Sequence, residues 1–132
     1  MNKVIHFEIP ADDVERASNF YRKAFGWIIN KAPVHDKEYN LSNTVDTDER
    51  GVPKELGAIN GAIMKREVEG ESPLIVVKVS SIEMYLKRIL SSGGRFVLGK
   101  TRTENMGYYA RFRDTEGNVI GLYEESLKKG RV

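Results

Sequence analysis

The chain carries the same local pattern twice, at a constant spacing in residue number. Asp12, with a glutamate at position 15, has the form of a helix-capping box, and Ser80 with Glu83 repeats this form in the second half. Gly26 and Gly94, which are suited to end the two helices, lie as far apart as Asp12 and Ser80 do. We therefore predict an internal duplication in which both halves share one order of helices and strands.

Hydrophobic periodicity gives each half the order strand, helix, strand, strand, strand. Residues 4–9 alternate apolar and polar side chains, as a half-buried strand does, and 74–79 take the same place in the second half. The two helices are expected to run from the capping boxes to Gly26 and to Gly93-Gly94. The predicted strands are 4–9, 27–32, 39–45 and 58–65 in the first half and 74–79, 95–100, 108–113 and 119–123 in the second.

These elements predict one α+β domain covering the whole 132-residue chain. It would consist of two βαβββ modules, about 4–66 and 74–125, joined by the linker 67–73. One face of each module must be covered by its own helix, so the other faces can curl around a shared hollow. The expected result is a cupped mixed sheet with helices on the outside, and the hollow is the default ligand site. A single α+β sheet whose halves are similar by accident is the alternative.

Composition excludes several classes of partner and chemistry. The formal net charge is only +2, and the basic clusters are short (100–102 and 128–131), so we expect no nucleic-acid binding. The longest apolar runs are far shorter than the roughly 20 residues of a membrane span, and we expect no membrane association. The N-terminal residues resemble no signal peptide, which leads us to expect a cytoplasmic protein. Without cysteine, neither disulfides nor a cysteine-based zinc site can form.

The chain also lacks the sequence motifs of several enzyme mechanisms. It has no glycine-rich nucleotide-binding loop, no HExxH pair, no nucleophile elbow and no cysteine nucleophile. Hydride transfer, phosphoryl transfer and acyl-enzyme chemistry therefore have no visible basis in the sequence.

Three segments together resemble a known superfamily. They are HFEIPADD at 6–13, FYxxxFGW at 20–27 and DTEGNVIGL at 114–122. In these segments the chain is similar to the glyoxalase, bleomycin-resistance and extradiol-dioxygenase superfamily, also called the vicinal oxygen chelate superfamily, over about 4–124. The resemblance implies paired βαβββ modules that form a cup, often completed in a symmetric homodimer.

The resemblance also implies a divalent metal held by one residue from each of four strands, typically two His and two Glu. His6 matches the first histidine, but the equivalent position in the second half of the duplication is Leu74. The carboxylate of the closing strand falls on Gly121, and its counterpart in the first half is Gly61. Because catalytic zinc sites ordinarily use three protein ligands, we expect no metal and no other cofactor.

A displaced metal site is the alternative, and it would make the protein a metal-dependent lyase, isomerase or dioxygenase. His6 and Glu8 should share one face of their strand, because side chains at i and i+2 point the same way. Glu124 is a weaker candidate, since it lies three positions past Gly121 and should point to the opposite face. His35 lies in a loop whose reach the sequence does not define.

The expected function is the binding of a small organic molecule in the cup, with enzymatic activity left open. His6 can act as a general base or as a hydrogen-bond partner of the ligand, because its imidazole titrates near neutrality. The two glycines leave room for a flat or aromatic ligand. The alternatives are a histidine that only lines the wall, a structural Glu8–Lys78 ion pair, and glycines that permit close strand packing. The expected ligand-binding residues are His6, Glu8, Gly61, Lys78, Gly121 and Tyr123.

Overall fold

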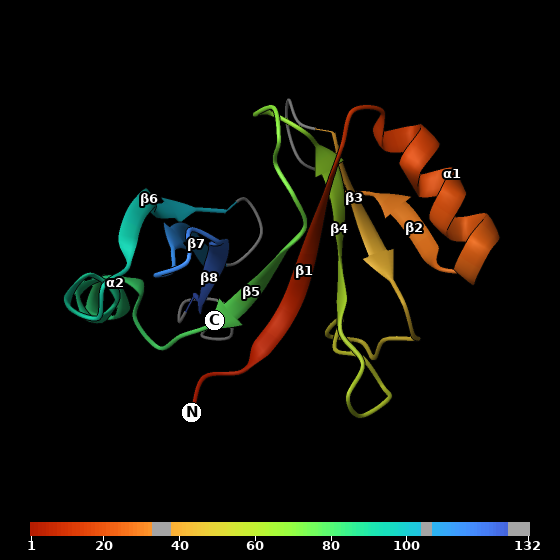
Figure 1. Ribbon diagram of the computed structural model, residues 1–132. Helices are drawn as coiled ribbons and strands as arrows, with labels where there is room; N and C mark the ends of the chain where they lie inside the picture. The colour runs from red at the N-terminus through yellow and green to blue at the C-terminus, as the bar shows by residue number, and fades with distance from the viewer. Residues whose placement is uncertain (33–37, 104–106, 127–132) are drawn as a thin grey trace. The chain divides into compact units, whose positions relative to one another are not determined.

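The computed structural model describes residues 1–32, 38–103 and 107–126 (Figure 1). Its elements confirm the predicted order of strand, helix and three strands, repeated once. Neither described helix is long and apolar enough to cross a membrane. The elements are β1 (Val4–Ala11), α1 (Val14–Phe25), β2 (Ile28–Lys31), β3 (Tyr39–Asn43), β4 (Asn60–Lys65), β5 (Leu74–Lys78), α2 (Ile82–Ser91), β6 (Arg95–Arg102), β7 (Gly107–Arg113) and β8 (Val119–Glu125).

The chain divides into two compact units. The N-terminal unit is His6–Pro73, and the C-terminal unit is Leu74–Val132 together with Met1–Ile5, so that β1 crosses the boundary. The N-terminal unit has the strand order β2-β3-β4-β1, in which β1 and β4 are parallel and the other pairs antiparallel. The C-terminal unit repeats this arrangement as β6-β7-β8-β5, with β5 and β8 parallel. The fold is therefore α+β with mixed sheets, whereas the cup stays a prediction.

Each helix begins one residue later than the capping boxes predict. Asp13, not Asp12, caps α1, and its side chain accepts a hydrogen bond from the Arg16 amide at 2.9 Å. Ser81, not Ser80, caps α2 in the same way. A capping residue needs extended backbone, and both capping residues have it, with φ of −132° and −151°. Because both caps move by one residue, the spacing between the two halves is preserved.

The predicted ends of the two helices are only partly equivalent. Gly26 ends α1 in the left-handed conformation, with φ of 71°, as predicted. In α2 the left-handed residue is Gly93, with φ of 99°, and not its repeat counterpart Gly94. Gly94 is required for a different reason: a Cβ there would lie 2.5 Å from Cγ2 of Ile89. The pair Gly93-Gly94 thus combines a left-handed turn with a close approach of the chain to Ile89.

In each unit the helix lies along one face of the sheet (Figure 1), and a hydrophobic core of its own fills the space between them. Apolar spacing predicts one buried stripe on each helix, and three residues of these stripes are exposed instead: Ala24, Phe25 (64%) and Leu90 (53%). The predicted stripes are Val14, Ala17, Tyr21, Ala24 and Phe25 on α1 and Ile82, Tyr85, Leu86, Ile89 and Leu90 on α2. Leu90 lies about 80° around the helix from Ile82, at the edge of the stripe. The buried core residues are Ala11, Val14, Ile29 and Ile63 in the N-terminal unit and Val79, Ile82, Ala110 and Leu122 in the C-terminal unit.

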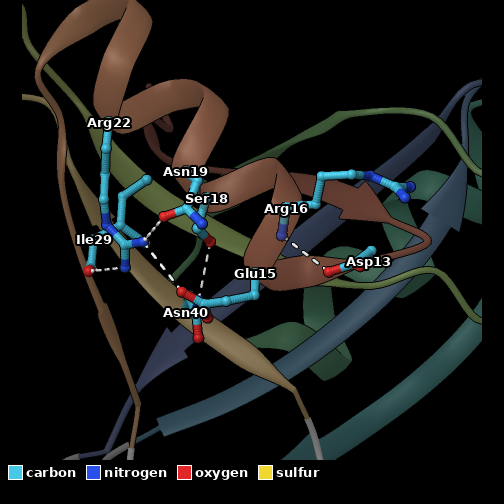
Figure 2. Close-up of polar contacts among 8 residues, drawn as sticks. All are labelled: Asp13, Glu15, Arg16, Ser18, Asn19, Arg22, Ile29 and Asn40. Atoms are coloured by element: carbon cyan, nitrogen blue, oxygen red, sulfur yellow. Dashed lines mark hydrogen bonds and ion pairs between the residues drawn. The ribbon is translucent and has the colours of Figure 1, made fainter.

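Polar contacts also attach α1 to the sheet of the N-terminal unit (Figure 2). Ser18 and Asn40 are both buried, and the Asn40 amide donates a hydrogen bond to the Ser18 hydroxyl at 2.9 Å. Arg22 donates to the carbonyl of Ile29 at 2.7 Å. Since buried polar groups are stabilising only when paired, this pairing fixes where α1 lies on β2 and β3.

Replacing Ser18 with alanine should destabilise the protein by about 1–3 kcal/mol, because Asn40 then loses its buried acceptor. Its remaining acceptor is a Glu15 carboxylate oxygen at 3.5 Å. The free energy of unfolding in urea measures the effect. Ser91→Ala, at an exposed serine of α2, is the matched control and should change stability by less than about 0.5 kcal/mol. Equal effects of the two substitutions would contradict the assigned role of Ser18.

Candidate functional site

The candidate site lies on the face of the N-terminal sheet opposite α1. Along β1, Phe7 contacts Trp27 and Ile9 packs on the core under α1, so His6 and Glu8 project from the other face. The parallel register pairs His6 with Asn60 and Glu8 with Ala62 on β4. Strand β3 adds Tyr39 beside them. We call this surface, made of His6, Glu8, Tyr39, Asn60 and Ala62, the polar face.

The Tyr39 hydroxyl lies between the imidazole of His6 and the carboxylate of Glu8. It is 3.3 Å from Nε2 of His6 and 3.5 Å from Oε2 of Glu8, to which it donates. Both distances are at the long end of the hydrogen-bond range. Together the three groups provide a base, a hydroxyl and a carboxylate.

Burial dominates the electrostatics of the polar face. It lowers the pKa of His6 below 6.5, although the nearby carboxylate of Glu8 acts in the opposite direction. His6 is therefore a neutral imidazole at pH 7, able to accept a proton or a hydrogen bond through one ring nitrogen. Glu8 is only 4% exposed.

Sequence reasoning overlooked the two polar residues Tyr39 and Asn60 of the polar face. Tyr39 stands out in the sequence only as one of several strand aromatics. Asn60 has no signal in the sequence, because the repeat spacing pointed to its neighbour Gly61. The register of β1 on β4 is what places Asn60 beside His6.

Gly61 lies on the other face of the sheet, the one that α1 covers. Its partner in the register is Phe7, and a Cβ on Gly61 would lie 2.4 Å from the Phe7 carbonyl oxygen and 2.5 Å from its ring. Only glycine permits this close approach of β1 and β4. The structure therefore favours the packing alternative for Gly61.

The other predicted ligand-binding residues lie together in the C-terminal unit, on the sheet face opposite α2. Lys78 pairs in register with Tyr123, and Val76 pairs with Gly121. Lys78 forms an ion pair with Glu125 at 3.2 Å. Burial, and then the charge of Glu125, raise the pKa of the Tyr123 phenol from 10.0.

Gly121 gives space to an aromatic ring. A Cβ there would lie 3.0 Å from the hydroxyl of Tyr109 and 3.1 Å from Cγ2 of Val76. The Tyr109 hydroxyl in turn accepts a hydrogen bond from Nε of Arg111 at 2.8 Å. A tyrosine and an arginine therefore flank the position where a metal-binding carboxylate would be expected.

The donor set does not fit the four-ligand metal site that the sequence resemblance implies. No group of three or more His, Cys, Asp or Glu that could hold a metal occurs among residues 1–32, 38–103 and 107–126. Leu74 is buried and offers no donor. Glu124 is used elsewhere: it accepts a hydrogen bond from the Ile82 amide at 2.8 Å and so stabilises the start of α2. His35 lies outside the described residues.

Comparison with known proteins gives a family and a fold. A profile of the Glyoxalase/Bleomycin resistance protein/Dioxygenase superfamily matches residues 3–122. Methylmalonyl-CoA epimerase from Mycobacterium tuberculosis has a TM-score of 0.68 at 20% identity, over 98% of this chain and 91% of that chain. The Streptomyces coelicolor methylmalonyl-CoA epimerase, in complex with 2-nitronate-propionyl-CoA, has a TM-score of 0.68 at 17% identity, over 95% and 98%.

A Vibrio splendidus member of the same superfamily has a TM-score of 0.62 at 13% identity, over 95% of this chain and 100% of that chain. No curated protein matches the chain. At these identities the similar structures establish the fold alone. The profile match spans most of the chain and carries the assignment to a family.

The lowered pKa of His6 predicts that the protein loses stability as the pH falls below 6.5. At pH values between the pKa of His6 in the folded protein and 6.5, the unfolded chain binds more protons at His6 than the folded chain does. Acid therefore favours unfolding in this range. Above pH 6.5, His6 is mostly neutral in both the folded and the unfolded protein, so its contribution to the free energy of unfolding is constant. Urea unfolding between about pH 5 and 8 should show that His6→Gln has a weaker pH dependence than the wild type.

His35→Gln is the matched control, since His35 is the other of the two histidines. It should keep the part of the pH dependence that His6 contributes. Direct NMR titration of the His6 ring should give a midpoint below 6.5. A midpoint above this value would mean that the Glu8 charge, and not burial, dominates at this site.

Proposed function

Since the chain belongs to the Glyoxalase/Bleomycin resistance protein/Dioxygenase superfamily, we propose that it binds a small organic molecule without the metal usual in that superfamily. The observation that carries the proposal is the composition of the polar face. It combines a neutral imidazole, a hydroxyl and one buried carboxylate. Strand β4, which pairs with β1, contributes Asn60 and Ala62 to this face, and neither residue carries a carboxylate that could bind a metal.

In this proposal the residues of the polar face have distinct roles. His6 is the hydrogen-bond partner of the ligand and the base for any proton transfer. Tyr39 orients the His6 ring through its hydroxyl. Glu8 holds that hydroxyl from the other side. We keep Lys78, Gly121 and Tyr123 as proposed ligand-binding residues of the C-terminal unit, taken by itself. Gly61 is left out because a side chain there would meet Phe7.

A metal-dependent lyase, isomerase or dioxygenase with a displaced site is the second candidate. The proximity of His6 and Glu8 favours it, because imidazole and carboxylate are both common metal ligands. The two candidates differ in whether the binding of an organic molecule at His6 depends on a divalent ion.

Binding at the polar face can be measured with three flat probes: benzamide, benzoate and phenol. The protein is labelled with 13C in its histidine rings, and the His35→Gln variant leaves the signal of His6 alone. We expect at least one probe to shift this signal in a saturable way, with the millimolar affinity usual for such small ligands. The shift should be the same in the presence of EDTA.

His6→Gln, read out by the ring signals of Tyr39 on the polar face, should bind the same probe more weakly while retaining the fold. Loss of binding in EDTA, together with about one divalent ion per chain by elemental analysis, would favour the displaced metal site. If none of the probes shifted the His6 signal, the binding proposal would be wrong for flat organic molecules.

We also propose a cytoplasmic homodimer. In the described part of the C-terminal unit, β6 is an edge strand that exposes Phe96 (59%) and Leu98 (40%). Exposed apolar edge strands favour association unless they are covered. Twofold-symmetric dimers are the commonest homo-oligomers, and such a dimer would cover this edge.

Light scattering coupled to size-exclusion chromatography should therefore give twice the 15.0 kDa mass of the chain. Phe96→Lys places a charge on the exposed edge and should shift the equilibrium toward the monomer. Ile28→Lys, at a residue 56% exposed in edge strand β2 of the N-terminal unit, tests the other edge: a shift to the monomer with this variant, and not with Phe96→Lys, would contradict a contact through β6. A monomeric wild type at micromolar concentration would contradict the dimer.

A further inference from the structure

The hydroxyl of Tyr39 lies between two side chains of β1, and its single proton can go to only one of them. Its oxygen is 3.3 Å from Nε2 of His6, and it donates to Oε2 of Glu8 at 3.5 Å. A carboxylate carries no proton and can only accept. If the hydroxyl donated to His6 instead, its oxygen would face the Glu8 oxygen with no proton between them. The proton of Tyr39 therefore points to Glu8.

The acceptor capacity of Glu8 supports this direction. Glu8 is buried, and a buried carboxylate is stable only when hydrogen-bond donors face it. Its two oxygens offer about four acceptor positions, so the further interactions of Glu8 leave room for the Tyr39 proton. Hydrogen bonds to a charged acceptor are also stronger than those to a neutral one, which favours the carboxylate over the imidazole as the acceptor.

The register of the sheet brings the Tyr39 hydroxyl to β1. Strand β4 lies between β3 and β1 (Figure 1). On this face Tyr39 pairs with Met64 of β4. His6 pairs with Asn60 of the same strand. Ala62 lies midway between these two positions and is fully buried. Because its side chain is a single methyl group, the Tyr39 side chain can cross β4 there.

The direction of the Tyr39 proton determines the tautomer of His6. Since the hydroxyl gives its proton to Glu8, it can only accept a hydrogen bond from Nε2 of His6. A neutral imidazole carries one N–H, which must then be on Nε2. Nδ1, on the other edge of the ring, is left as the bare nitrogen.

We propose that Glu8 and Tyr39 hold His6 in the Nε2–H tautomer and so make Nδ1 the basic nitrogen that meets the ligand. Glu8 acts through Tyr39 and is a positioning residue. The ligand then presents an O–H or N–H group to His6, and a compound that carries only acceptors binds more weakly. This inference rests on the proposed function and narrows its ligand class to hydrogen-bond donors.

The tautomer can be measured without any ligand. In the His35→Gln variant, labelled with 15N in the histidine ring and held at about pH 8, one set of signals reports the neutral His6 ring. A bare and a protonated ring nitrogen differ widely in 15N chemical shift, and a free imidazole in water averages over both tautomers. We expect unaveraged shifts, with Nδ1 bare. Averaged shifts, or a bare Nε2, would overturn the inference.

Two substitutions of Glu8 separate its acceptor oxygen from its bulk. In Glu8→Leu the Tyr39 proton loses its acceptor and should turn to Nε2 of His6, so that the N–H moves to Nδ1. Glu8→Gln keeps a side-chain oxygen and should keep the wild-type tautomer. An unchanged tautomer in folded Glu8→Leu would contradict the role of Glu8. If that variant does not fold, the shifts measured with Glu8 in place still decide the tautomer.

Phenol and anisole test the ligand class, because they share a ring and differ in whether the oxygen carries a proton. Phenol should shift the Nδ1 signal of His6 and bind at least about fivefold more tightly than anisole, because anisole lacks the donor. Equal affinity would overturn the preference for donors.

The two proposals can fail separately. If His6 shows the expected tautomer but neither phenol nor benzamide moves its signals, the tautomer assignment stands and the proposed function fails for these probes. If the probes bind to a His6 ring whose tautomers are averaged, the inference fails and the proposed function stands.

Discussion

The alternation of side chains along β1 governs the arrangement of the whole N-terminal unit. One face of the strand presents Phe7 and Ile9 to the core under α1, and the other presents His6 and Glu8. Because successive side chains of a strand point to opposite faces, the core under α1 determines where the polar residues lie. A shift of one residue would bury His6 and Glu8 under the helix and expose the apolar residues. The stability of the core therefore positions the candidate site.

Polar pairing strengthens the same arrangement from the helix side. The buried contact between Ser18 and Asn40 and the hydrogen bond from Arg22 to the Ile29 carbonyl are directional, unlike apolar packing (Figure 2). They fix the helix on β2 and β3, and β3 in turn carries Tyr39 to the polar face. The hydroxyl that lies between His6 and Glu8 thus depends on contacts made on the opposite side of the sheet.

The chemistry of the polar face follows from burial and from the few groups that share it. Burial keeps the imidazole neutral against the attraction of Glu8, and no third ligand-type side chain joins these two within the described residues of the polar face. A site of this kind is better suited to hydrogen bonding and proton exchange than to metal binding. Comparison with the epimerase structures supports the fold and leaves the chemistry to these residues.

Local patterns in the sequence were enough to predict the duplication, the class of each element and the helix starts to within one residue. Strand periodicity, helix caps and glycines in turns carry this information within short segments. They also placed His6 and Glu8 on one strand face. The folded chain was needed to show that Asn60, and not Gly61, lies beside His6, and that Tyr39 reaches both His6 and Glu8. The register between β1 and β4 is set by packing between segments that are distant in the chain, and no local pattern encodes it.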